Sequence, residues 1–367
     1  MISKRCQEMS VSGIRKVFEL SQKLDNPVDL SIGKPDFPVP EELKDEALRA
    51  IKENKNDYSL TLGLPQLREK VAEKLNSRNH IKTDVKNIAI TSAVSGGLSV
   101  VIPTIIDQGD EIVIFDPYFV GYKQIILLFG GVPKIVPKNE DFSLDIKELK
   151  NAISNKTKAI IVNTPENPTG HVWSKEELQA VVKIARENDL IIIADEIYED
   201  FIYDKVNKHI SVASMYNKVV TLGGFSKSHA ITGWRIGYMC APEEIINQVA
   251  KVQQYTFVCP PTPLQYGVLK AFDVDVVEHV ELYKNNRDAL FEALKDNYDI
   301  VQSQGAFYFF VKYPCEGTKF VNKCTSNNLL IVPGEVFSEN NSHFRISFAT
   351  KAEEISKAVK ILDRIYV

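Results

Sequence analysis

Five short apolar runs recur along the chain, and each is separated from the next by a segment with helical spacing of its apolar positions. They cover residues 88–91, 112–115, 159–162, 190–194 and 219–222. A strand covered by helices on both faces is apolar at successive positions, so these runs predict a mostly parallel sheet sandwiched by helices. The pattern indicates an α/β fold.

The pattern changes toward the end of the chain. A strand over 236–240 and a helix from 242 to about 255 precede a proline cluster, and a long helical region is predicted from 264 to about 295. Alternation over 306–311 and a helix over 352–365 then indicate a smaller α+β domain. For a chain of 367 residues we expect an N-terminal arm at 1–40 that completes the small domain, a large ligand-binding domain at 41–280 and the small domain at 281–367.

Residues suited to ligand binding follow each of the five runs. They occupy 92–97, 116–119, 163–170, 195–198 and 223–227. Open α/β sheets bind ligands at the carboxyl ends of their parallel strands, where all these segments would meet. We therefore expect them to form one site.

Lys227 follows the last of these runs, and Arg235 comes eight residues later after a second glycine turn. A lysine that forms a Schiff base needs a cationic or apolar setting that lowers its pKa. An arginine nearby can hold a phosphate with its planar guanidinium. Our hypothesis is a cofactor bound through Lys227 and held through Arg235; an ordinary surface lysine is the alternative interpretation.

Arg345 lies inside the strand-like run 344–348. A lone cation in such a run is costly unless it is paired. We therefore expect an anionic partner, with a protein carboxylate favoured and a ligand carboxylate as the alternative.

Composition narrows the classes of partner. The net charge is −4, with 44 basic and 48 acidic residues interspersed, which argues against nucleic acid or an anionic membrane as the main partner. No apolar run approaches the length of a membrane span, and the first residues lack a signal peptide's apolar core. Five cysteines without a CxxC motif indicate a reducing cytoplasm, and six scattered histidines predict no metal site.

Several motifs occur in an informative order. They are Ser-Ile-Gly-Lys-Pro-Asp-Phe at 31–37, the pattern YxxxxGxxxLR at 58–68, Asn-Pro-Thr-Gly at 167–170, Asp-Glu-Ile-Tyr at 195–198, Ser-Lys at 226–227 with Gly-Trp-Arg at 233–235, and Phe-Arg-Ile-Ser-Phe at 344–348. Over essentially its whole length the chain resembles the fold type I pyridoxal-phosphate enzymes, and within them the class I/II aminotransferases.

The resemblance implies a role for each residue around the ring of pyridoxal 5′-phosphate. Lys227 would form the internal aldimine and then act as the general base between the substrate's α-carbon and the cofactor's C4′. Asp195 would keep the pyridine nitrogen protonated. Tyr198 and Asn167 would hydrogen-bond the phenolic oxygen, and Phe119 would stack on the ring.

The resemblance also implies how the phosphate is held. The backbone N–H groups of Val94 and Ser95 would bind it at the start of a helix, together with Ser226 and Arg235. Tyr58 would reach the phosphate of the neighbouring subunit, so a homodimer with shared sites is part of the hypothesis.

The substrate's α-carboxylate would be bound by Arg345, helped by Asn167 and by the backbone around Gly33. Two positions depart from the family's usual pattern. Gly224 stands where many members carry a serine for the phosphate, and Lys34 stands where an acidic residue is frequent.

Three functions are compared. The first is a transaminase that exchanges an amino group between an L-α-amino acid and a 2-oxo acid. The second is a carbon–sulfur β-lyase with the same cofactor, suggested by His171-Val172-Trp173, although such lyases usually carry histidine where Tyr198 stands. The third is a ligand-sensing domain, for which the residues before Gly33 are too few to form the usual winged helix. The first is favoured, and the named residues leave the amino acid donor open.

Overall fold

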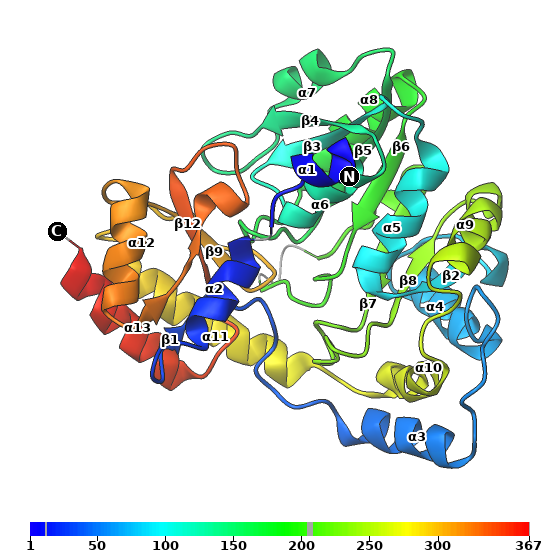
Figure 1. Cartoon of the computed structure of the whole chain (residues 1–367), viewed down its shortest axis with the longest axis horizontal. Coiled ribbons are helices and arrows are strands. Elements are labelled where there is room, and N and C mark those ends of the chain that lie inside the picture. Colours follow the sequence, from blue (N-terminus) through cyan, green and yellow to red (C-terminus); the bar gives the residue numbers. More distant parts are fainter. Residues whose placement is uncertain (12, 204–207, 367) are drawn as a thin grey trace.

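The computed structural model describes residues 1–11, 13–203 and 208–366. Its largest sheet has seven strands in the order β2-β8-β7-β6-β5-β3-β4 (Figure 1). The strands are β2 (Ile88–Thr91), β3 (Glu111–Asp116), β4 (Val132–Pro137), β5 (Thr157–Asn163), β6 (Ile191–Asp195), β7 (Val219–Gly224) and β8 (Gly237–Cys240). In the described chain, β8 is antiparallel to both of its neighbours and the other paired strands are parallel, which confirms the predicted mostly parallel sheet.

Strand β4 is missing from the predicted set. It carries Pro133, Lys134 and Pro137 and is only partly buried, because it lies at the edge of the sheet beside β3. An edge strand tolerates proline and polar side chains, so the continuous apolar run that marks the central strands is absent here.

Successive residues of the central strands enter two different cores. In β3, Ile112 and Ile114 pack in one core with α5, α6 and α9, while Val113 and Phe115 pack in another with α7 and α8. The helices are α5 (Ala93–Ile105), α6 (Val120–Leu128), α7 (Ile146–Ala152), α8 (Lys175–Glu187) and α9 (Glu243–Thr256). Burial on both faces is the physical reason for the unbroken apolar runs.

The helical region predicted from 264 to about 295 is not one continuous helix. The structure has α10 (Thr262–Val268), the 3₁₀ helix η3 (Leu269–Asp273) and α11 (Val277–Leu294) instead. Val268 packs in a core with α3 (Glu41–Lys52) and α4 (Pro65–Ser77), whereas Leu290 packs in the core of the smaller part. The interruption therefore lets the chain pass from one core to the other.

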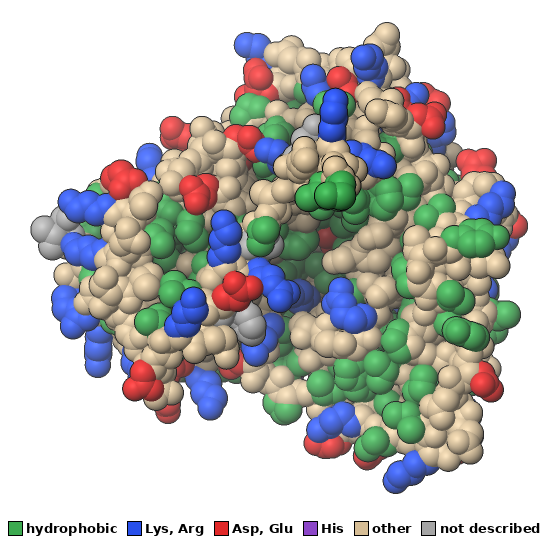
Figure 2. Space-filling view, in the orientation of Figure 1, with side chains coloured by type: hydrophobic (Ala, Val, Ile, Leu, Met, Phe, Trp, Pro, Cys, Tyr) green, Lys and Arg blue, Asp and Glu red, His purple; other side chains and the backbone are tan. Residues whose placement is uncertain are grey.

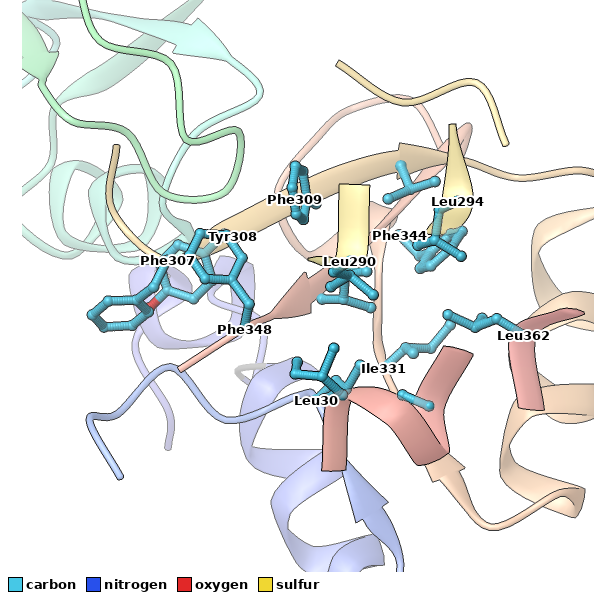
Figure 3. Close-up of a cluster of buried hydrophobic side chains, with 14 of the residues drawn as sticks. Leu30, Leu290, Leu294, Phe307, Tyr308, Phe309, Ile331, Phe344, Phe348 and Leu362 are labelled. Atoms are coloured by element: carbon cyan, nitrogen blue, oxygen red, sulfur yellow. The ribbon is translucent and has the colours of Figure 1, made fainter. Parts of the chain in front are cut away.

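The smaller part is built on the antiparallel sheet β11-β12-β9 and the parallel pair β1-β10. Its elements are β1 (Val28–Asp29), β9 (Tyr308–Lys312), β10 (Leu329–Leu330), β11 (Val332–Pro333), β12 (His343–Ser347), α12 (Gly317–Ser326) and α13 (Ala352–Ile365). Figure 3 shows its core, where Leu30 from the N-terminal segment packs with Leu290, Phe344 and Leu362. The smaller α+β part is confirmed.

The run at 306–311, where alternation is predicted, overlaps strand β9. Residues 306–311 are all buried, because Phe309 and Val311 face the core with α11 while Phe310 packs on the other side with Phe142 and Phe337. The remaining short elements are α1 (Lys4–Glu8), α2 (Gly13–Ser21) and the 3₁₀ turns η1 (Val85–Asn87), η2 (Val212–Ser214) and η4 (Gly334–Val336). Among the described residues, every helix is too short or too polar to span a lipid bilayer.

Candidate active site

A cavity of about 200 Å³ lies at the carboxyl edge of the large sheet, where it meets the smaller part. In Figure 2 the molecule is hollowed between these two parts, with Lys and Arg side chains around the hollow. The predicted site residues that line the cavity are Gly33, Val94, Ser95, Phe119, Asn167, Asp195, Tyr198, Ser226, Lys227, Arg235 and Arg345. The structure thus brings together segments that are far apart in the sequence.

Tyr58 and Gly224, both considered in the sequence, are not among the cavity-lining residues. Tyr58 is 85% exposed and lies outside the cavity of this subunit. At Gly224 an added Cβ would lie 3.0 Å from the Cα of Gly237 and 3.4 Å from Ile197, so the close approach of β7 and β8 favours glycine there.

Lys227 lies just beyond β7, and its Nζ donates a hydrogen bond of 2.7 Å to the carbonyl oxygen of Gly33. Burial and then the positive charges of Arg345 and Arg235 lower the pKa of Lys227 to about 8. The carboxylate of Asp195 acts in the opposite direction. A lowered pKa makes the neutral, nucleophilic amine more accessible near neutral pH, which is the setting a Schiff-base lysine requires.

Asp195 ends strand β6 and is buried. Its Oδ2 accepts a hydrogen bond of 2.6 Å from the hydroxyl of Tyr122, and its Oδ1 accepts one of 3.2 Å from the N–H of Ile197. Burial raises the pKa of Asp195 to about 6, while the Tyr122 hydroxyl works against this rise. A cationic partner, such as a protonated ring nitrogen, would therefore stabilise the charged form of Asp195.

Replacement of Tyr122 by phenylalanine should raise the pKa of Asp195 further, by about one pH unit, because the carboxylate loses a hydrogen bond in a buried site. Carboxyl ¹³C NMR titration of the cofactor-free protein measures this, and Asp195→Asn identifies the signal. Tyr118→Phe, which removes a hydroxyl bound to Glu339 instead, is the matched control and should leave the Asp195 titration unchanged. An unchanged titration in Tyr122→Phe would show that the contact does not hold the carboxylate.

Asn167 is held by a hydrogen-bonded loop after β5. The side chain of Asn163 donates to the carbonyl of Asp195 at 3.0 Å, and its Oδ1 accepts the N–H of Asn167 at 3.0 Å. Next to it, buried Glu166 accepts hydrogen bonds from Thr169 and Trp173 and pairs with Lys138. These bonds connect the loop to the ends of β5 and β6 and fix the position of Asn167.

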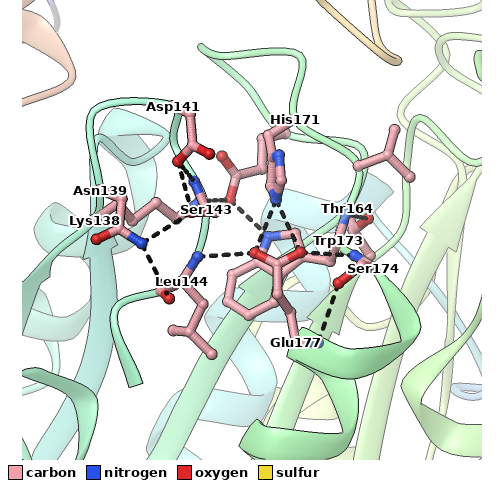
Figure 4. A network of polar contacts seen from close by, with 12 residues as sticks. Lys138, Asn139, Asp141, Ser143, Leu144, Thr164, His171, Trp173, Ser174 and Glu177 are labelled. Atoms are coloured by element: carbon pink, nitrogen blue, oxygen red, sulfur yellow. Dashed lines mark hydrogen bonds and ion pairs between the residues drawn. The ribbon is translucent and has the colours of Figure 1, made fainter. Parts of the chain in front are cut away.

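His171 belongs to a polar network beside this loop (Figure 4). Its Nε2 lies 3.1 Å from Glu177, which also accepts the N–H groups of Leu144 and Ser174 at 2.8 Å. Burial alone would raise the pKa of Glu177, but the partner His171 and these N–H groups lower it to about 2. Ser174 and Glu177 form a capping box at the start of α8, and His171 belongs to this network and does not line the cavity.

Arg345 lies on β12 and is 1% exposed. Its guanidinium donates to Asn167 Oδ1 at 2.9 Å and to the carbonyl of Ser31 at 2.7 Å, and it lies between the rings of Tyr308 and Phe337. The favoured expectation of a protein carboxylate is wrong: the described part of the chain places none at ion-pair distance, and the buried Nε has no hydrogen-bond partner. The anion-binding capacity of Arg345 is therefore left to a ligand.

The far end of the cavity has the features of an anion cradle. Val94 and Ser95 lie in the first turn of α5, where backbone N–H groups lack helical acceptors. Ser226 Oγ is buried and has no hydrogen-bond partner in the described part of the chain, and the exposed Arg235 donates a hydrogen bond of 2.9 Å to the carbonyl of Thr232. Together with Lys227 and Asp195, which line the same cavity, these groups fit pyridoxal 5′-phosphate.

Tyr122 and Tyr308 are cavity residues that were not predicted from the sequence. Tyr122 lies three residues after Phe119, so the helical spacing of α6 could have indicated that both face one site. Tyr308 bonds the hydroxyl of Tyr198 at 2.8 Å and comes from the smaller part of the molecule. Nothing in the local sequence pattern signals that contact.

One cluster in the described chain has metal-ligand spacing. Atoms of Glu196, Glu199 and His209 lie within 4.8 Å of one another. Protein groups already engage them: His209 lies 3.0 Å from Glu196, and Lys74 pairs with Glu199. The cluster forms a buried ion-pair network, and the expectation of no metal site stays a prediction.

The sheet order, the smaller part and the cavity at the strand ends define a fold type I pyridoxal-phosphate enzyme. The family model for aminotransferase class I and II matches residues 25–362. The chain belongs to this family and is a transaminase.

The chain is similar to named relatives over their full length. A probable aspartate aminotransferase of Methanocaldococcus jannaschii is 39% identical, with 100% of each chain covered. Aromatic-amino-acid aminotransferase 2 of Thermococcus litoralis is 35% identical, with 99% of this chain and 98% of the relative covered. The solved structure of Thermus thermophilus aspartate aminotransferase with maleate has a TM-score of 0.93 at 32% identity and 99% coverage of both chains. These relatives give no support to the β-lyase alternative.

Proposed function

We propose that this transaminase binds pyridoxal 5′-phosphate in the cavity and exchanges an amino group between an L-α-amino acid and a 2-oxo acid. The observation that carries the proposal is the juxtaposition of the Lys227 amine, the buried carboxylate of Asp195 and the buried guanidinium of Arg345 around one cavity. When bound, the cofactor supplies an electron sink for the bond broken at the α-carbon.

Different residues along the cavity would contact different parts of the cofactor. Asp195 would accept a hydrogen bond from the ring nitrogen, and Tyr198 and Asn167 would contact the phenolic oxygen. Phe119 would lie against the ring. Lys227 would carry the cofactor and move a proton between the α-carbon and C4′, a task suited to an amine with a lowered pKa.

At the two ends, anions would be bound. The N–H groups of Val94 and Ser95, with Ser226 and Arg235, would hold the phosphate. Arg345 would bind the substrate's α-carboxylate and thereby orient the Cα–H bond beside Lys227. Asn167 and the backbone at Gly33 would complete this end.

We also propose a homodimer in which Tyr58 reaches the partner subunit's phosphate. Exposed apolar side chains on the large-sheet part support an interface: Tyr58 is 85% and Leu60 62% exposed, and Tyr255 is 87% exposed. Light scattering of the purified protein tests the dimer, and a fully active monomer would contradict it.

The domain limits at 40 and 280 and a cytoplasmic location remain proposals. Pairing of β1 with β10 supports assigning the arm to the small domain, and α11 enters the small core from Val280 onward. The described cysteines are all unpaired, which supports a reducing compartment. Cysteine alkylation in cell extracts and limited proteolysis would check the two points.

Screening the twenty amino acids against 2-oxoglutarate and pyruvate tests the function. We expect visible absorption from the cofactor-loaded protein and amino-group transfer that depends on the 2-oxo acid, with aspartate and aromatic amino acids as the first donors to try. Release of pyruvate and ammonia without an acceptor would instead indicate the lyase. A protein that binds no pyridoxal phosphate would refute the proposal.

A further inference from the structure

Tyr308 is a buried residue that joins three groups of the active site. It begins β9, and it is 1% exposed (Figure 3). Its hydroxyl lies 2.8 Å from the hydroxyl of Tyr198, and its ring lies 4.4 Å from the guanidinium carbon of Arg345. Tyr198 follows a strand of the large sheet, so Tyr308 bridges the two parts of the molecule at the site.

Tyr308 packs so closely against Gly33 that no side chain fits between them. A Cβ added at Gly33 would lie 2.2 Å from the Tyr308 hydroxyl and 3.0 Å from its ring. The carbonyl of the same Gly33 accepts the hydrogen bond from Lys227. The Tyr308 hydroxyl is thus confined between the Tyr198 hydroxyl and the backbone of the loop that contacts the lysine.

The number of available phenol protons decides which tyrosine donates the hydrogen bond in this pair. Each phenol has one proton to donate, and either oxygen could donate in the pair of Tyr198 and Tyr308. If Tyr198 donates to the cofactor's phenolic oxygen, its proton is used, so Tyr308 must be the donor within the pair. A chain of this kind strengthens each bond in it, because every donor is polarised by the bond it accepts.

We propose that Tyr308 is a positioning residue with two separable tasks: its hydroxyl makes Tyr198 a stronger donor toward the cofactor, and its ring holds the Arg345 guanidinium flat for the substrate carboxylate. This inference rests on the proposed function. The ring contact is a cation–π interaction in a buried site, where such contacts are strongest.

Two substitutions separate the tasks. Tyr308→Phe keeps the ring and removes the hydroxyl, while Tyr308→Leu removes both. We expect both variants to raise the pH midpoint of the bound cofactor's visible absorption change by about half to one unit, because a weaker donor leaves more negative charge on the phenolic oxygen to retain the nearby proton. Only Tyr308→Leu should also raise KM for the best amino acid donor, by about 3- to 30-fold.

A double variant tests whether the hydroxyl acts through Tyr198. Adding Tyr308→Phe to Tyr198→Phe should shift the midpoint by less than about 0.2 unit beyond the single Tyr198→Phe change, because the bond is already gone. Thermal unfolding of the cofactor-free variants checks that they are folded. An unchanged midpoint in Tyr308→Phe would overturn the first task, and an unchanged KM in folded Tyr308→Leu would overturn the second. Failure of the wild type to bind pyridoxal phosphate would refute the proposed function instead.

Discussion

Replacing Lys227 by alanine should lower the rate of amino-group transfer by about 10⁴-fold or more. The change removes both the covalent attachment of the cofactor and the group that moves the proton, and general acid–base catalysis alone contributes about 10²- to 10⁴-fold. The Lys227 amine donates a hydrogen bond to the Gly33 carbonyl, and burial together with Arg345 and Arg235 lowers its pKa to about 8. Single-turnover mixing with the best amino acid donor, followed by cofactor absorption, measures the loss.

Lys218 provides a matched control for Lys227. It directly precedes strand β7, which Lys227 follows, and it pairs with Asp189 at the surface. Lys218→Ala should leave the transfer rate within about twofold, since exposed ion pairs contribute little. If Lys227→Ala kept the wild-type transfer rate, the proposed catalytic role of Lys227 would be wrong.

Replacing Arg345 by leucine should lower kcat/KM by about 10²- to 10⁴-fold, because the two charge-assisted hydrogen bonds that we propose to the substrate carboxylate would be lost. Arg345→Lys should recover only part of this, since a lysine cannot make the planar two-point contact. The buried guanidinium has no carboxylate partner among the described residues, and removal of this unpaired charge offsets the loss of its hydrogen bonds to Asn167 and Ser31, so Arg345→Leu should change the stability of the cofactor-free protein little. Steady-state kinetics and urea unfolding measure the two effects.

Arg287 is the control for a buried arginine with a structural role. It donates to the carbonyl of Ser303 at 3.0 Å, pairs with Asp288 and lies over the ring of Tyr203. Arg287→Leu should lower stability while kcat/KM of the folded protein stays within about threefold. If Arg345→Leu behaved like Arg287→Leu, with lost stability and retained kcat/KM, the carboxylate-binding role would be wrong.

The site was predictable where it depends on the ends of parallel strands. Asp195 and Lys227 each follow an apolar run, and parallel strands bring such positions to one edge whatever the helices between them do. Arg345 was noticed as a cation inside a strand-like run, and the resemblance assigned it and Gly33 to the substrate carboxylate, although both lie in segments without that signal. The sheet itself was predicted for the same reason, except for its edge strand β4, where Pro133 and Lys134 hide the pattern.

Individual side-chain contacts between segments distant in sequence could not be predicted. The hydroxyl pair of Tyr198 and Tyr308 joins residues 110 positions apart, and only the packing of β9 against the large part creates it. The partner of Arg345 was wrongly predicted because its burial was foreseen but the neighbouring Asn167 and Ser31 oxygens were not. The break between α10 and α11 similarly reflects which core each helix joins.

The surroundings of Arg345 affect the choice of assay buffer. A guanidinium stacked between two aromatic rings, with neutral oxygens as its neighbours, will attract any small monoanion of suitable shape. Acetate or formate in a buffer would therefore compete with amino acids and act as weak inhibitors. Assays of this protein are best made in buffers built on bulky sulfonates, with chloride kept low.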